Sequence, residues 1–394
     1  MTRFTSVVPA NAGTPAGEEG RALSRRGSRF RGNNGVGLIA SLLLLAVPTV
    51  AQAPVAFPVV RPGATLAFPR DHGAHPDYRT EWWYVTGALR DESGAPLGFQ
   101  VTFFQSRLPF ADENPSRFAP RHAVAGHAAL SDVGAAKLHH AQGVYRAGLG
   151  IAGAGQDDAD VRMRNWRLWR GADGLWRARA GGEGFALELT FRPTQPALLQ
   201  GERGYSRKGS DPEAASYYYS LPHLAVTGRV RRDGRWSDVT GRAWLDREWS
   251  STLLDARAAG WDWAGINLDG GGALTAFQVR GRDGRAQWTG GSYRAADGAQ
   301  VSFGPEDVRW EPLRRWRSPR TAAVYPVAQA VTVRLPSGPR RFVLTPAFPD
   351  QELDGRASGT AVYWEGLVGV SGAGRGQGYL EMTGYAAPFA DARP

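Results

Sequence analysis

The chain has 394 residues, and its 14 Trp, 16 Phe and 12 Tyr favour strands, whereas 51 Gly and 26 Pro would interrupt long helices, so we expect an all-β protein. The absence of cysteine excludes disulfide bonds, a thiol nucleophile and a thiolate metal site. The formal net charge is +10, but all 47 basic residues except Lys137 and Lys208 are arginines and they form no long basic block, so no nucleic-acid partner is expected.

Residues 1–53 have the pattern of a presequence that ends in a signal peptide. A basic stretch at 25–31 precedes an apolar run at 36–47, and small residues follow at Ala51 and Ala53. A basic region, a short apolar core and a small-residue tail are typical of secretory signals, and the core is short for a membrane span. We expect cleavage near Ala51 or Ala53 and a periplasmic or secreted protein. An uncleaved membrane anchor is the alternative.

Strand and hairpin signals dominate the mature chain. Residues 81–89 and 97–105 flank a polar turn, and residues 261–268 and 273–280 are joined by Asp-Gly-Gly-Gly. Both patterns are typical of β-hairpins, and residues 217–230 form another long candidate strand.

Two irregular segments suggest how the chain is divided. Residues 108–126 contain three prolines and have no counterpart downstream, so they could form a lid or access loop. Residues 252–260 are the best candidate for a link between two domains. We expect an N-terminal domain at 54–251 and a C-terminal domain at 252–394.

The sequence contains two copies of one pattern, with the landmarks in the same order. The matched segments include Trp82-Trp83-Tyr84 and Trp261-Asp262-Trp263, Phe99-Gln100-Val101 and Phe277-Gln278-Val279, residues 143–147 and 291–295, Tyr218-Tyr219-Ser220 and Tyr363-Trp364-Glu365, and residues 241–246 and 376–381. Shared order over so long a stretch indicates an internal duplication. Many strands with Gly-rich turns suit closed antiparallel barrels, so we expect two tandem β-barrels.

Four sequence blocks resemble a known family. They are Phe-Pro-Arg-Asp-His-Gly-Ala-His at 68–75, Glu-Trp-Trp-Tyr-Val-Thr-Gly at 81–87, Tyr-Ser-Arg-Lys-Gly at 205–209 and Trp-Leu-Asp-Arg-Glu-Trp at 244–249. The chain resembles the AttH family from about Phe68 to Tyr385, and the same superfamily contains the carotenoid 1,2-hydratases. The resemblance implies two lipocalin-like barrels that share a site for an apolar ligand, and it leaves open whether the protein binds or converts that ligand.

Hydratase chemistry can be compared with these residues. Adding water to an isolated C=C bond requires a proton donor, aromatic faces that stabilise a cation, and a positioned water. Asp246 is our candidate acid, because apolar surroundings raise the pKa of a carboxyl group. Trp244 shares its strand face, and Tyr217 and Tyr219 share a face of a neighbouring candidate strand, so we assign all four to the catalytic group.

The resemblance bears on this assignment. The hydratases tend to carry His-x-Trp and Tyr-x-Asp at the matching positions, so the acid is kept here while its partners differ. The structural alternative is that Asp246 pairs with Arg247 or another arginine as a strand-end carboxylate.

Further ligand-binding residues are expected in the first copy. They are His72, His75, Glu81, Trp82, Trp83, Tyr84, Gln100, Phe103 and Trp249. Glu81 could line the barrel or neutralise Arg79, and most aromatic residues belong to the core. His72 and His75 have a spacing that permits metal ligation, but Pro76 disfavours a helical arrangement, so we expect no metal and no cofactor.

These observations lead to three functional hypotheses. The first is binding of an apolar, lipid-like or terpenoid molecule in the first barrel, with the second barrel as a brace. The alternative is a hydro-lyase of the carotenoid 1,2-hydratase type. The third is an accessory module of a membrane export permease.

Overall fold

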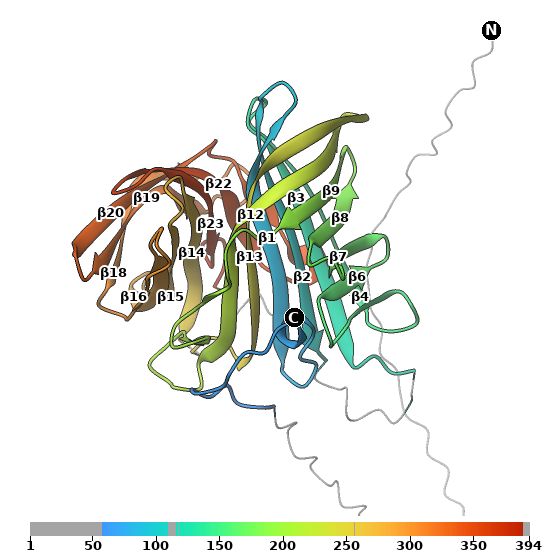
Figure 1. Ribbon diagram of the computed structural model, residues 1–394, viewed down its shortest axis with the longest axis horizontal. Coiled ribbons are helices and arrows are strands. Elements are labelled where there is room, and N and C mark those ends of the chain that lie inside the picture. Colours follow the sequence, from blue (N-terminus) through green and yellow to red (C-terminus); the bar gives the residue numbers. More distant parts are fainter. Residues whose placement is uncertain (1–56, 109–115, 117, 256, 389–394) are drawn as a thin grey trace, which may run out of the picture. The chain divides into compact units, whose positions relative to one another are not determined.

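The computed structural model describes residues 57–108, 116, 118–255 and 257–388, and these contain 23 strands and two short 3-10 helices, Arg70–His72 and Arg356–Ser358 (Figure 1). The all-β prediction is therefore confirmed. The expected signal peptide and its cleavage sites lie outside the described ranges. Within those ranges, no helix has both the length and the apolar character needed to cross a bilayer.

The first sheet has 13 strands in the order β4-β3-β2-β1-β13-β12-β9-β8-β7-β6-β5, and β10 and β11 pair with β12. Its strands are β1 Thr80–Asp91, β2 Pro96–Arg107, β3 His122–Asp132, β4 Lys137–Arg146, β5 Ala152–Ala154, β6 Asp160–Met163, β7 Trp166–Arg170, β8 Trp176–Gly182, β9 Phe185–Arg192, β10 Leu198–Leu199, β11 Tyr205–Arg207, β12 Ala215–Arg232 and β13 Arg235–Thr252. Strands β3 and β4 contact β5, β6 and β8 across the interior, so the sheet is a nearly closed barrel, called here the N-terminal barrel.

The second sheet has ten strands in the order β17-β16-β15-β14-β23-β22-β20-β19-β18, and β21 pairs with β22. Its strands are β14 Ala258–Leu268, β15 Ala273–Gly281, β16 Ala286–Arg294, β17 Gln300–Phe303, β18 Val308–Arg317, β19 Val324–Leu335, β20 Gly338–Pro346, β21 Glu352–Asp354, β22 Val362–Gly372 and β23 Gly376–Thr383. This sheet is the C-terminal barrel. The sheets change between Thr252 and Ala258, and the domain boundaries themselves stay predictions.

The two sheets repeat one topology, which confirms the internal duplication. In each, the first strand pairs with the last: β1 with β13, and β14 with β23. The register is also shared, because Tyr84 lies opposite Asp246 as Trp263 lies opposite Glu381.

Two of the sequence matches are not structurally equivalent. Trp82 lies opposite Phe104, whereas Trp261 lies opposite Val279, so residues 277–279 correspond to 102–104 and not to 99–101. Residues 143–147 lie largely on β4, whereas 291–295 lie largely on β16, the counterpart of β3. Short aromatic-polar patterns recur in many strands, and only the ladder decides which copies match.

Apolar side chains fill both barrels. Strand β9 shows the pattern, because its buried residues Phe185, Leu187, Leu189 and Phe191 alternate with more exposed ones. The N-terminal core also contains Trp83 and large aromatic residues of β2 and β8, and the C-terminal core is built around Tyr325, Phe342 and Trp364 with aliphatic side chains. Large side chains of the N-terminal barrel therefore point into the interior in which the ligand pocket was expected.

A third apolar layer lies between the barrels. It is formed by the outer faces of β1, β2, β12 and β13 and of β14, β15, β22 and β23, and we call it the seam. Trp263 reaches across it, with its ring 5.3 Å from that of Tyr84 and 6.4 Å from that of Trp244. Trp263 Nε1 also donates a hydrogen bond to Tyr218 Oη (3.0 Å).

Candidate functional site

Strand β13 presents one face to the N-terminal core and the other to the seam. Leu245 and Trp249 belong to the core, and Arg247 lies over the core residue Trp83. Successive side chains of a strand point to opposite faces, so Trp244 and Asp246 face the seam.

Asp246 is buried in the seam, and none of its hydrogen-bond partners among the described residues is a cation. Its Oδ1 accepts hydrogen bonds from Ser220 Oγ (2.5 Å) and Trp244 Nε1 (2.6 Å), and its Oδ2 accepts one from Tyr218 Oη (2.7 Å). Burial raises the pKa of Asp246 to about 7, and the nearby charge of Glu248 adds to this rise. The three hydrogen bonds favour the ionised form and so act in the opposite direction. A carboxyl group with this pKa is protonated in part near neutrality and can donate a proton.

Beside Asp246, a buried ammonium compensates Glu248. Lys208 Nζ lies 3.2 Å from Glu248 Oε1 and 3.0 Å from Ser206 Oγ. The same ammonium lies over the rings of Tyr218 (4.6 Å) and Phe277 (4.3 Å). The seam thus holds a cation between aromatic faces and a carboxylate.

The C-terminal barrel contributes a second pair of acids to the seam. Glu365 on β22 lies directly opposite Glu381 on β23. Burial raises the pKa of Glu365 well above its usual range, and Glu381 adds to the shift. Glu381 is partly exposed as a residue, but burial still raises the pKa of its carboxyl group to about 8. The charges of Asp246 and Glu248 raise this pKa further, and a hydrogen bond from Trp261 lowers it.

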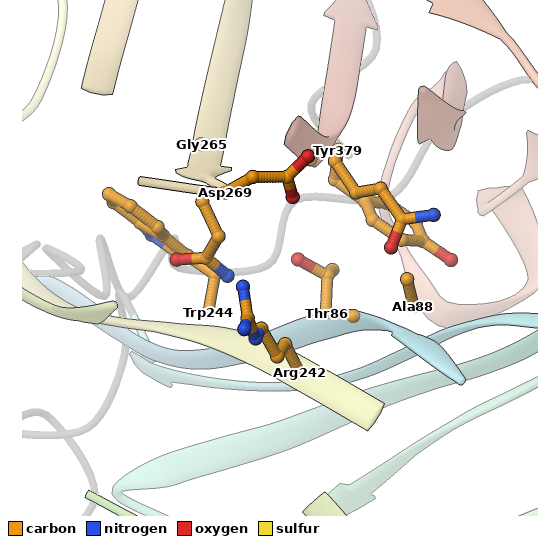
Figure 2. Close-up of a pocket in the computed structure, with 11 residues that line it drawn as sticks. Thr86, Ala88, Arg242, Trp244, Gly265, Asp269 and Tyr379 are labelled. Carbon is orange, nitrogen blue, oxygen red and sulfur yellow. The ribbon is translucent and has the colours of Figure 1, made fainter. Parts of the chain in front are cut away.

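A small cavity of about 30 Å³ lies between β1, β13, β14 and β23 (Figure 2), and this is room for one water molecule. Arg242 and Asp269 line it and are exposed, whereas Thr86, Trp244 and Tyr379 line it and are buried. Since Trp244 Nε1 donates to Asp246, one side chain connects the cavity to the acid.

A sequence model of the AttH-like family matches residues 59–385, which include every strand of both barrels. The chain belongs to the AttH-like family. None of the curated proteins matches this AttH-like chain.

Two solved structures are similar to the AttH-like chain. One is a protein described as an AttH from Nitrosomonas europaea, with 49% sequence identity and a TM-score of 0.77, and the match covers 84% of this chain and 99% of that one. The other is kievitone hydratase from Nectria haematococca, with 16% identity and a TM-score of 0.63, covering 84% of this chain and 94% of that one. The second likeness shows a shared fold.

The structure divides the residues expected at the site between two places. Asp246, Trp244, Trp82, Tyr84 and Gln100 lie in the seam of this AttH-like chain. The others lie inside the N-terminal barrel or at its end: Tyr217, Tyr219, His72, His75, Glu81, Trp83, Phe103 and Trp249.

Tyr217 and Tyr219 are therefore not beside Asp246. Tyr219 lies opposite Arg247 in the ladder, and Tyr219 Oη is 2.6 Å from His72 Nδ1. Tyr218 and Ser220 occupy the face that Asp246 shares, because a shift of one residue along a strand reverses the side-chain direction.

Glu81 and Arg247 form a buried ion pair. Two alternatives raised from the sequence therefore do not hold, namely a pair of Glu81 with Arg79 and a pair of Asp246 with Arg247. The ring of His75 stacks on Trp249 at 3.8 Å, and its backbone N–H donates to Glu81 Oε2 (2.9 Å). These side chains hold the segment before β1 against the barrel. No cluster of three or more potential metal ligands occurs in the described part of the chain.

Several polar residues of the seam were not among those expected at the site from the sequence. They are Lys208, Tyr218, Ser220, Glu248, Glu365 and Glu381. One usable signal was present, because Lys208 is one of only two lysines in an arginine-rich chain. The duplication also matched Asp246 with Glu381, and this match could have indicated the second acid.

Proposed function

We propose that the chain is a hydro-lyase that adds water to an isolated C=C bond of an apolar, terpenoid-like molecule bound in the seam. The observation that carries the proposal is the buried, proton-holding carboxyl of Asp246 beside the rings of Trp244 and Trp263. The similarity of fold to a structure named as a hydratase is consistent with it. Asp246 and Trp244 face the seam and not the interior of the N-terminal barrel, so the proposal places the ligand in the seam.

The proposed reaction begins with proton transfer from Asp246 to one alkene carbon, so that the π bond breaks and a C–H bond forms. The other carbon becomes a carbocation, which the faces of Trp244 and Trp263 stabilise. Water then forms the C–O bond and returns its proton to the Asp246 carboxylate. The cavity beside Trp244 is large enough for that water.

The test is hydration of an acyclic carotenoid by the purified chain, followed by product analysis. Asp246→Asn removes the transferable proton, and we expect the rate to fall by about 10²- to 10⁴-fold, the usual range for general acid catalysis. Asp173→Asn changes an exposed carboxyl group that pairs with Arg177 of β8 in the N-terminal barrel, and it should retain the wild-type rate. A rate that survives Asp246→Asn contradicts the proposal.

Binding without turnover is the second candidate, and one observation favours it. Both oxygens of Asp246 already accept hydrogen bonds, as they would in a site whose role is structural. Under this proposal a lipid-like molecule binds in the seam and changes the fluorescence of Trp244 and Trp263. Ligand binding by a wild-type chain that hydrates no polyene would support this candidate over the first.

The cellular setting is also a proposal. The basic and apolar pattern before Ala53 supports export to the periplasm or beyond, and an exported binder could serve a membrane export permease. Protein recovered from a periplasmic extract, with an amino terminus at residue 52 or 54, would support export.

A further inference from the structure

The two halves of the seam are related by the duplication but differ in their charge. Equivalent positions are Asp246 and Glu381, Ser220 and Glu365, Tyr218 and Tyr363, Trp244 and Tyr379, and Trp263 and Tyr84. In the half that contains Asp246, the ammonium of Lys208 compensates Glu248. In the half that contains Glu365 and Glu381, the groups that shift the carboxyl pKa values most include no cation.

Unpartnered polar atoms gather around Glu365. Among the described residues, Glu365 Oε1, Gln100 Oε1, Tyr84 Oη and Tyr379 Oη are buried and none has a partner with good hydrogen-bond geometry, although Tyr84 lies close enough to Glu365 to lower the pKa of that carboxyl group. The side chains of Gln100 and Glu365 also contact each other through their other polar atoms, because Gln100 Nε2 donates a hydrogen bond to Glu365 Oε2 (2.6 Å). The charge of Glu365 also raises the pKa of both tyrosines, next after burial. Gln100 Oε1 can only accept hydrogen bonds, and so can Glu365 Oε1 when the carboxyl group is ionised, so a donor in addition to the two tyrosine hydroxyls would satisfy these oxygens.

Aromatic rings complete this half of the seam. Tyr84 packs edge-on against Trp263, and Trp261 Nε1 donates to Glu381 Oε1 (3.2 Å). The arrangement of carboxyl groups and aromatic faces is that in which Lys208 is held in the other half. An ammonium supplies three donors, a positive charge and a fit to aromatic faces. Glu381 is partly exposed and so offers access from solvent, whereas Glu365 behind it is buried.

We propose that Glu365 and Glu381 form a binding site for the ammonium head group of an amine. The site consists of other residues than Asp246, although the charge of Asp246 acts on Glu381, and the proposal does not depend on whether the chain hydrates any alkene. The hydroxyls of Tyr84 and Tyr379 and the amide oxygen of Gln100 complete its walls.

Binding of the ammonium is coupled to loss of a proton. The pair holds a proton in the free protein, and a cation beside it favours the ionised form, so one proton passes to solvent when the amine binds. The titratable groups that face the pair are Tyr84 on β1, Tyr363 on β22, His127 on β3 through Tyr363, Asp246 and Glu248 on β13, and Tyr379 on β23. Burial lowers the pKa of His127 to about 3, so this side chain carries no competing positive charge near neutrality.

The experiment is calorimetric titration of the full chain at pH 7 with octylamine and, separately, with octanol. The two probes share an alkyl chain and differ in charge. We expect octylamine to bind at least tenfold more tightly than octanol and to release about one proton, measured by repeating the titration in buffers of different ionisation enthalpy. Equal affinity, absence of binding by octylamine, or binding without proton release would overturn the proposal.

Glu365→Gln keeps the shape and removes the ionisable group. We expect it to fold, because it removes an uncompensated buried acid, and to abolish both the preference for octylamine and the proton release. Glu352→Gln is the matched control, since Glu352 is a buried carboxyl of the same barrel that Arg320 compensates outside the seam. A preference for octylamine that survives Glu365→Gln, or that Glu352→Gln removes in a folded protein, would also overturn the proposal.

Discussion

Arg247 is 0% exposed, and its charge is compensated within the N-terminal barrel. Its guanidinium pairs with Glu81 and donates to Gly73 O (2.6 Å), and its Cζ lies 3.9 Å from the ring centroid of Trp83. A buried charge that loses its partner is costly, because the remaining ion is left in a medium that solvates it poorly.

We therefore expect Arg247→Met to lower the free energy of unfolding by about 3–5 kcal/mol. Adding Glu81→Gln should restore part of that loss, because it removes the ion left without a partner, and urea denaturation of the single and double variants measures this coupling. Arg229→Met, which breaks an exposed pair with Glu188, is the control and should cost about 0–1 kcal/mol. Additive effects of the changes at 81 and 247 would contradict this account.

At the level of single residues, the sequence predicted Asp246 as the candidate acid, and its role stays a prediction, whereas the residues that surround it could not be predicted. Asp246 and Trp244 share a strand, so alternation alone places them on one face. Tyr218 and Ser220 belong to another strand, and only the register between the strands brings them to Asp246. Register depends on the ladder and on irregularities such as the shift between Leu221 and Leu224, which no local pattern specifies.

Among the elements, β14 depends on a glycine where it crosses β13. A Cβ on Gly265 would lie 2.5 Å from a ring atom of Trp263 and 3.0 Å from one of Trp244. The close approach of the two barrels at this point therefore requires that position 265 has no side chain. The same glycine lines the small cavity (Figure 2).

Gly265→Ala should displace one of the two tryptophans and cost about 1–3 kcal/mol of stability, as overpacking usually does. We also expect a change in tryptophan fluorescence, because both rings lie in the seam. Gly369→Ala in β22 is the control, since the nearest atom to its added Cβ lies 4.0 Å away, and its stability should change by less than about 1 kcal/mol. Equal stability losses for the two variants would show that the crossing tolerates a side chain.

The elements themselves were more predictable than the site. Alternating burial in β9 and the turn between β14 and β15 follow directly from the local sequence. The duplicated order of strands was likewise visible in the sequence. The assignment of the ligand pocket to the first barrel stays a prediction, because the volume left inside a barrel depends on how its large side chains pack against one another, and the local sequence does not specify that packing.

For the molecule as a whole, buried acids and buried histidines have opposite effects on stability as the pH changes. Asp246 holds its proton up to about pH 7 when folded and loses it near pH 4 when unfolded, so its contribution to stability falls as the pH rises between these values. Burial lowers the pKa of His72 and His127 to about 3. Both side chains therefore take up protons on unfolding below about pH 6.5, so the stability that they contribute falls as the pH falls.

Asp246→Asn should remove the first effect. Between pH 5 and pH 7, we expect the free energy of unfolding of the variant to rise relative to that of the wild type by about 1 kcal/mol per pH unit. The substitution also has a cost that does not depend on pH, and this cost does not affect the slope. Chemical denaturation at pH 5, 6 and 7 measures the difference. Parallel pH profiles for the two proteins would mean that Asp246 is already ionised at pH 5.

The seam has a consequence for how the two copies can evolve. The Gln100 amide, from one copy, hydrogen-bonds to Glu365 of the other, and Tyr218, from one copy, accepts a hydrogen bond from Trp263 of the other. A mutation in either half therefore alters the surroundings of its duplicate. Because side chains of the two copies depend on each other for hydrogen bonds, neither copy can change or be lost independently, and selection acts on the pair as one heritable unit.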